Sequence, residues 1–311
     1  MNAIEIKDLS KTYRKDFWGK KISAVVDISF SVKEKIITGF VGPNGAGKTT
    51  TIKSVMGLIR PTTGSITIFG TDVSNCSARK KVAYLSEQPY FYGHLTVNES
   101  LEFACNLIGI PKDIKQNEIQ RVLDIVELSH KSKSKVKEMS KGMQQRLNMA
   151  QALLGKPNLM ILDEPMSGMD PPGRRLFRSL FKKLASQGTT VFFSTHVLED
   201  IESVCDEVVV VAKGKVTYTG AVKDLLVKGI KGTEMLITTS DKEIRNYLVD
   251  RKCYIESDID GELDFIIPKD TSPIEIQKYL SAKEIFPTQI TNRSESLENL
   301  LYGEYDGSND K

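Results

Sequence analysis

The stretch from Gly42 to Thr49 contains the residue types that bind phosphate: three glycines, a lysine and a hydroxyl. The glycines let the backbone curl so that successive N–H groups point inward at phosphate oxygens. Lys48 would neutralise the β- and γ-phosphates, and the Thr49 hydroxyl can bind Mg²⁺. The sequence therefore predicts a site for a nucleoside triphosphate, formed by Gly42, Asn44, Gly45, Ala46, Gly47, Lys48, Thr49 and Thr50.

The segments on either side of this loop favour the same interpretation. The apolar run 36–41 predicts a buried strand, and residues 48–56 predict a helix. This motif binds phosphate when it joins a strand to a helix, because the helix N-terminus adds a favourable dipole end. A chance glycine turn is the alternative, and this context disfavours it.

Two carboxylates, Asp163 and Glu164, follow the apolar run 159–162. That run predicts a buried strand, so both carboxylates emerge at its C-terminal end, where open α/β sheets bind ligands. We expect Asp163 to hold Mg²⁺ through its water shell and Glu164 to act as the general base toward water. The alternative is a pair of acids that begins a turn, which a neighbouring phosphate loop disfavours.

Polar side chains also follow two other predicted strands. Gln88 comes after the strand 82–85, where it suits a Mg²⁺ or water contact near the γ-phosphate, although an ordinary polar strand end has the same pattern. His196 comes after the strand 190–193 and can reach the γ-phosphate, although a lone histidine is more often structural. We expect Gln88 and His196 to be catalytic.

The segment 13–21 is aromatic and basic, and it lies between two predicted antiparallel strands at 4–6 and 28–32. A flat ring near the phosphate loop can stack on a nucleobase, and we expect Tyr13 to do so. Phe17 and Trp18 are alternatives for that role, or they cap the sheet edge.

Helical periodicity begins at about residue 96 and is strongest around residues 101–108 and 119–126. Ser140 is placed as the N-cap of a further helix that carries Leu147 and Ala150. A helix over 171–187 has an apolar inner face and a basic outer face, which we interpret as a solvated surface.

The composition limits the kind of protein. With 311 residues, of which 40% are hydrophobic, the chain has room for one large globular domain and a smaller one. A net charge of +3 is too small to indicate a nucleic-acid partner. The four cysteines lie far apart, which fits a reducing compartment and argues against zinc. Without a signal-peptide pattern or a membrane-spanning apolar run, we expect a cytoplasmic protein that reaches a membrane only through a partner.

The order of these motifs resembles the nucleotide-binding subunit of ATP-binding cassette (ABC) transporters over roughly residues 3–225. The resemblance implies an α/β fold with a RecA-like P-loop core, an N-terminal antiparallel β subdomain and an inserted helical subdomain at about 90–155. It implies ATP and Mg²⁺ as ligands and ATP hydrolysis as the reaction. The residues that carry it are the phosphate loop, Gln88, 140–144, Asp163, Glu164, 167–170 and His196.

The same resemblance implies a head-to-tail homodimer with two ATP molecules between the protomers. Ser140 and Gly142 of one protomer would contact the γ-phosphate held by Lys48 of the other. Tyr13 matches the adenine-stacking aromatic residue, and Asp170 matches the loop that links the two sites.

The resemblance also implies a separate polytopic membrane permease as partner, at the inner face of the cell membrane, in an exporter. An importer subunit and a cytosolic ABC ATPase without a transport role are the alternatives. The aromatic segment 89–94 would face the groove that receives the permease, or would pack under the helical subdomain.

The sequence departs from the family's L-S-G-G-Q signature at Met139, Lys141 and Met143. Ser140 and the Gly142 backbone, which are suited to reach phosphate, remain. Lys141 would add a cation near the opposing nucleotide or point to solvent, so the signature leaves the turnover rate open.

Residues 226–311 lie beyond the resemblance and predict a small accessory domain. Their strands and helices follow the order βαββαβ of a ferredoxin-like unit, with a hairpin turn at Asp260-Gly261. A short helix over 297–301 and a frayed polar tail would follow. This domain would pair with its twin in the dimer, brace the cassette or sense a ligand.

Overall fold

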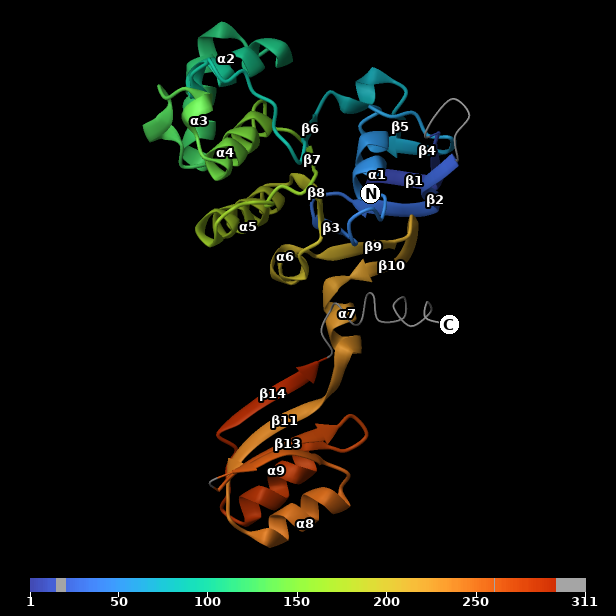
Figure 1. Cartoon of the computed structure of the whole chain (residues 1–311), viewed down its shortest axis with the longest axis vertical. Helices are drawn as coiled ribbons and strands as arrows, with labels where there is room; N and C mark the ends of the chain where they lie inside the picture. The colour runs from blue at the N-terminus through green and yellow to red at the C-terminus, as the bar shows by residue number, and fades with distance from the viewer. Residues whose placement is uncertain (15–20, 260, 295–311) are drawn as a thin grey trace. The chain divides into compact units, whose positions relative to one another are not determined.

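The computed structural model in Figure 1 describes residues 1–14, 21–259 and 261–294. Contacts between residues divide the chain into two compact units, Met1–Val222 and Lys223–Lys311. Phe17, Trp18, Asp260 and the predicted short helix and tail after residue 296 lie outside the described residues.

A six-stranded sheet forms the centre of the first unit, with the strand order β10-β9-β3-β8-β7-β6. The strands from β9 to β6 run parallel, and β10 is an antiparallel edge. All residues of β3, β7 and β8 are buried, as their continuous apolar runs predicted. The strands are β3 (Ile37–Val41), β6 (Val82–Leu85), β7 (Leu159–Leu162), β8 (Thr190–Thr195), β9 (Glu207–Ala212) and β10 (Lys215–Ala221).

A second, antiparallel sheet has the order β2-β1-β4-β5 and packs on the first through a shared core. The rings of Phe30 on β2, Phe40 on β3 and Phe192 on β8 lie 5.4–6.1 Å apart in this core. The two predicted N-terminal strands are confirmed and are longer than the pattern suggested. The strands are β1 (Asn2–Arg14), β2 (Lys21–Lys33), β4 (Thr63–Ile68) and β5 (Thr71–Asp72).

Helices cover both faces of the six-stranded sheet. Helix α1 (Lys48–Val55) contacts β2 and β4 in the core shared with the second sheet. On β8, Phe192 points into that core, whereas the Phe193 ring lies 5.4 Å from Phe181 of α5 (Pro171–Ser186). Because adjacent strand residues point to opposite faces, α5 and α6 (Leu198–Val204) cover the other side.

Three helices, α2 (Val97–Ile108), α3 (Lys112–Ile125) and α4 (Lys141–Ala152), contact one another and form a separate helical group (Figure 1). Thr96 and Glu99 make a capping box that starts α2. Ser140 is the N-cap of α4, as predicted, and its hydroxyl accepts a hydrogen bond from the Met143 N–H at 3.3 Å. Short 3₁₀ turns lie at Cys76–Arg79, Ser129–Lys131 and Val136–Glu138.

The second unit has the predicted βαββαβ order and the antiparallel strand order β12-β13-β11-β14 of a ferredoxin-like fold. Its own hydrophobic core joins Met235, Phe265 and Leu280. Its elements are β11 (Ile230–Thr238), α8 (Lys242–Asp250), β12 (Tyr254–Ile259), β13 (Glu262–Pro268), α9 (Pro273–Ala282) and β14 (Gln289–Ser294), and α7 (Val222–Gly229) precedes them.

Candidate active site

The loop between Val41 and Lys48 joins the C-terminal end of a central strand to the N-terminus of α1. Gly47 is the N-cap residue and has a φ of 102°, which other residue types rarely adopt. A Cβ atom on Gly42 would lie 2.3 Å from the carbonyl oxygen of Val211. Both positions therefore require glycine, and the loop takes the shape that its composition predicted.

Lys48 is buried, and its ammonium group contacts this loop and an acid that follows another strand. Its Nζ donates a hydrogen bond to the Gly42 carbonyl at 2.6 Å and lies 3.5 Å from Oε1 of Glu164. A buried charge requires such partners. The phosphate loop and the Glu164 carboxylate are thus joined by one cation.

Glu164 follows β7 with a φ of 47°, in the left-handed region where a non-glycine residue is strained. Its N–H donates a hydrogen bond to the Ser194 hydroxyl at 3.0 Å. The same hydroxyl donates to Oδ1 of Asp163 at 2.6 Å, and Ser194 is fully buried. A hydroxyl on β8 therefore holds both acids at the end of β7.

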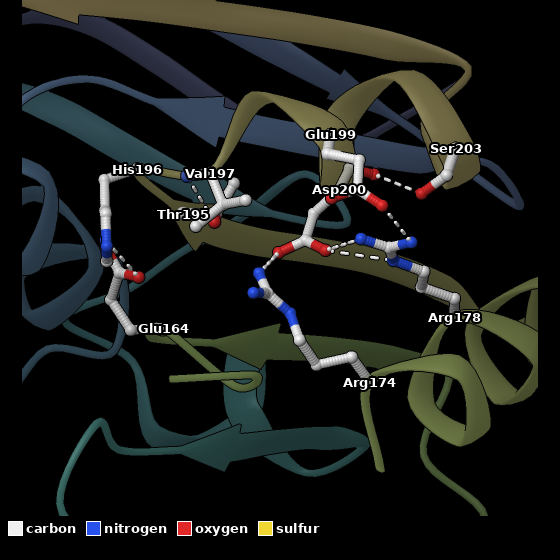
Figure 2. Close-up of polar contacts among 9 residues, drawn as sticks. All are labelled: Glu164, Arg174, Arg178, Thr195, His196, Val197, Glu199, Asp200 and Ser203. Carbon is white, nitrogen blue, oxygen red and sulfur yellow. Dashed lines mark hydrogen bonds and ion pairs between the residues drawn. The ribbon is translucent and has the colours of Figure 1, made fainter. Parts of the chain in front are cut away.

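His196 lies beside the other oxygen of the Glu164 carboxylate (Figure 2). The distance from its Nδ1 to Oε2 of Glu164 is 3.0 Å, and the His196 side chain is 48% exposed. Glu164 thus lies between Lys48 and His196, with one carboxylate oxygen toward each. A carboxylate in this position can accept a proton from a water molecule in the adjoining cavity.

The phosphate-loop cavity, as we call it, has a volume of about 460 Å³. It brings together six of the eight predicted loop residues with Glu164 and His196. Ser167 and Glu87 also line it, although we predicted no catalytic or binding role for either residue. The lining residues are Asn44, Gly45, Gly47, Lys48, Thr49, Thr50, Glu87, Glu164, Ser167 and His196.

Gln88 is exposed and, among the described residues, is not part of this lining. The Ser86 hydroxyl donates a hydrogen bond to the Gln88 carbonyl at 2.9 Å, which turns the chain after β6. Glu87 rather than Gln88 then faces the cavity. In this structure the turn thus places Gln88 apart from the other predicted catalytic residues, and its catalytic role stays a prediction.

Tyr13 lies near the end of β1, opposite Ile22 of β2, and is 37% exposed. The ammonium group of Lys11 lies 5.2 Å from the centre of its ring. In the described part of the chain, Tyr13 is outside the lining of the phosphate-loop cavity.

Asp163 is 1% exposed, and its carboxylate acts electrostatically on Tyr84 of β6. Burial, together with the negative charges of Asp163 and Glu87, raises the pKa of Tyr84 to about 12, so its hydroxyl stays protonated. The Thr49 hydroxyl lines the cavity itself. Hydroxyl and carboxylate oxygens are the donors that Mg²⁺ prefers, so these residues fit that ion.

A second cavity, of about 360 Å³, brings together Ser140, Gly142 and Asp170. We call it the Ser140 cavity. Within the described chain it shares no lining residue with the phosphate-loop cavity. Its lining is Glu127, Leu128, His130, Ser140, Gly142, Met143, Arg146, Gly168 and Asp170.

Residues 25–167, from β2 to the segment after Glu164, match the family model described as ABC transporter. The bacitracin transport ATP-binding protein BcrA of Bacillus licheniformis is 41% identical over 215 residues, which cover 68% of this chain and 67% of that protein. The linearmycin resistance ATP-binding protein LnrL of Bacillus subtilis is 35% identical over 71% of this chain and 70% of that protein. The chain belongs to the ABC transporter ATP-binding proteins.

A solved ATP-binding subunit of an ABC transporter is similar to this ABC protein, with a TM-score of 0.64 and 31% identity. The similarity covers 72% of this chain and 91% of the solved one. The predicted family and the predicted α/β fold are therefore confirmed, and this chain carries an ATP-binding ABC ATPase domain. Among its described residues, no helix is long and apolar enough to cross a membrane.

Proposed function

We propose that this chain is the ATP-hydrolysing subunit of an ABC exporter and drives a separate membrane permease. The observation that carries this proposal is the Glu164 carboxylate, held between Lys48 and His196 on the wall of the phosphate-loop cavity. A buried lysine at a phosphate loop serves binding, and the adjoining carboxylate serves catalysis.

In this mechanism the ammonium group of Lys48 binds the ATP phosphates in place of its present partners. Glu164 then accepts a proton from the water that attacks the γ-phosphorus, and the bond from that phosphorus to the β–γ bridging oxygen breaks, so that ADP leaves and phosphate forms. His196 holds the carboxylate and the γ-phosphate in line. Thr49 and Asp163 would hold Mg²⁺, which neutralises charge on the phosphates when bound. Gln88 joins this group only if the turn at residues 86–88 rearranges.

We assign the Ser140 cavity to the ATP molecule of a second copy of this chain. Ser140, Gly142 and Asp170 lie together but line a cavity separate from that of Lys48, so these predicted site residues are divided between two cavities. A head-to-tail homodimer joins the two halves. Tyr13 would stack on the adenine at the edge of the site.

A cavity of about 590 Å³, with exposed apolar side chains in its lining, supports a permease partner. Tyr90, Leu107 and Ile108 line it and are 89%, 70% and 55% exposed. Tyr92, in contrast, packs edge-on against Phe103 of α2, with ring centres 5.8 Å apart. Both interpretations of the segment 89–94 thus have support, and Tyr90 would contact a helix of the permease at the inner face of the membrane.

The names of two relatives support export as the direction of transport. BcrA is named for bacitracin transport and LnrL for linearmycin resistance, and resistance through a transporter requires outward movement of the compound. Import, or an ATPase without a transport role, is the alternative.

We further propose that residues 1–225 form the ATPase domain, with its helical subdomain at about 90–155. Residues 226–311 would pair with the same domain of the second protomer or brace the ATPase domain.

Affinity purification of this protein from detergent-solubilised native membranes tests the proposal. We expect a polytopic membrane protein to co-purify in stoichiometric amount and to stimulate ATP hydrolysis. Recovery only from the soluble fraction with cytosolic partners would contradict the transporter role. ATP-dependent uptake of the transported compound into right-side-out membrane vesicles would indicate an importer.

A further inference from the structure

Asp200 of α6 is a buried carboxylate that lines neither the phosphate-loop cavity nor the Ser140 cavity. It is 1% exposed, and two arginines of α5 bind it (Figure 2). Arg174 Nη2 donates to Oδ2 at 2.7 Å, and Arg178 donates to Oδ1 from Nε at 3.0 Å and from Nη2 at 2.7 Å. Three charge-assisted hydrogen bonds thus join the two helices.

The two ends of this network lie one turn away from predicted site residues. Asp170 is the N-cap of α5, its Oδ1 accepts the Gly173 N–H at 3.1 Å, and its carbonyl accepts the Arg174 N–H at 3.0 Å. Asp200 follows His196 by four residues, and its N–H donates to the Val197 carbonyl at 3.2 Å. The ion pairs therefore connect the segment after His196 to the segment after Asp170.

A small cavity of about 100 Å³ lies between this network and the catalytic pair. Glu164 and His196 line it together with Arg174 and Asp200. The loop 166–169 completes much of its wall. A change in the position of Asp200 therefore reaches both His196 and the loop before Asp170.

Burial distinguishes Asp200 from its neighbour. Glu199 also pairs with Arg178, at 2.9 Å, but its side chain is 72% exposed. An exposed ion pair contributes little, whereas a buried carboxylate that loses its partners is left uncompensated. The ion pairs of Asp200 with the two arginines therefore fix the position of α6 relative to α5. Glu199, on the same helix as Asp200, provides a matched control.

We propose that Asp200 is a positioning residue that fixes His196 relative to the Asp170 loop, so that the state of one ATP site is transmitted to the other. This inference rests on the proposed function, in which His196 acts at one site and Asp170 joins the two. Asp200 acts through Arg174 and Arg178 and does not contact the nucleotide.

The test compares Asp200→Asn and Glu199→Gln in the full chain. We expect Asp200→Asn to lower kcat for ATP at least about tenfold and to reduce the Hill coefficient toward one, since small misplacements near a reacting group have large effects on rate. The affinity for a fluorescent ATP analogue should stay within about twofold. Glu199→Gln should match the wild type.

A spectroscopic measurement separates positioning from general damage. The chain has three histidines, so the imidazole NMR signal of His196 can be assigned by its loss in His196→Ala. Asp200→Asn should shift that signal and leave those of His94 and His130 in place. If Asp200→Asn fails to fold, Arg174→Gln removes a bond of the same network and is measured in the same way.

An Asp200→Asn protein with normal kcat, or with reduced kcat and an unmoved His196 signal, would overturn the inference. An inactive wild type would instead contradict the proposed function, while the His196 signal would still report on positioning.

Discussion

The phosphate-loop cavity and the Ser140 cavity differ in how their side chains are bonded. In the first, residues far apart in sequence bind one another: Lys48 contacts Glu164, and Glu164 contacts His196. In the second, Arg146 and Glu127 form an ion pair at 2.9 Å, but the predicted site residues Ser140 and Asp170 accept hydrogen bonds from N–H groups three residues ahead, as the N-caps of their own helices. The first cavity is thus a connected site, whereas the second presents groups that a ligand from elsewhere can use, as expected of a half-site in a dimer.

The largest effect should come from removal of the Lys48 ammonium group, which joins the phosphate loop to Glu164. Lys48→Ala should weaken ATP binding by about 10- to 100-fold or more, because hydrogen bonds to charged groups are among the strongest. Isothermal titration with ATP and Mg²⁺ measures the change. Lys53→Ala, in the last turn of the same helix, is the control, and unchanged affinity in Lys48→Ala would refute the assignment of the loop.

Substitution of Gly142 tests the half-site. A Cβ on Gly142 meets no described atom within 4 Å, and an acid in the first turn of a helix is favourable. Gly142→Glu should therefore keep its unfolding temperature and its ATP affinity, but should lose ATP-dependent dimerisation and at least about tenfold in kcat. Size-exclusion chromatography with ATP measures the dimer. A variant that still dimerises would show that the Ser140 cavity faces no second copy.

A smaller effect is expected at Ser194, where one hydroxyl serves both acids. Ser194→Ala leaves the Glu164 N–H and the Asp163 carboxylate each without this partner, which should cost about 1–3 kcal/mol of unfolding free energy and lower kcat. Urea unfolding and steady-state kinetics measure both.

Thr38 of β3 is the matched control, because its buried hydroxyl has no hydrogen-bond partner among the described residues. Thr38→Val removes a buried hydroxyl that has no such partner, so the unfolding free energy should stay unchanged or rise. Equal behaviour of Ser194→Ala and Thr38→Val would contradict the role of Ser194.

The sequence predicted the features that local pattern controls. The phosphate loop, the apolar strands, the Ser140 cap and the βαββαβ order each depend on residues close together in the chain. Ser194 and Asp200 were missed because their partners lie 22–31 residues away. Their only signal was position, at the end of β8 and one turn after His196.

Two further features depend on backbone geometry that composition does not specify. The left-handed φ of Glu164 aims its carboxylate between Lys48 and His196, although glutamate has no preference for that conformation. The turn after β6 decides that Glu87, rather than Gln88, lines the cavity. The alternation of side chains along a strand stops where the strand ends. Beyond that point, the turn decides which way each side chain points.

The central claim is that Glu164 is the general base of ATP hydrolysis, and the steady-state rate of Glu164→Gln at saturating ATP and Mg²⁺ tests it most directly. We predict a loss of about 100-fold or more in kcat, with ATP binding intact and a stable ATP-bound dimer, because the amide cannot accept the proton. Turnover at the wild-type rate would contradict the account.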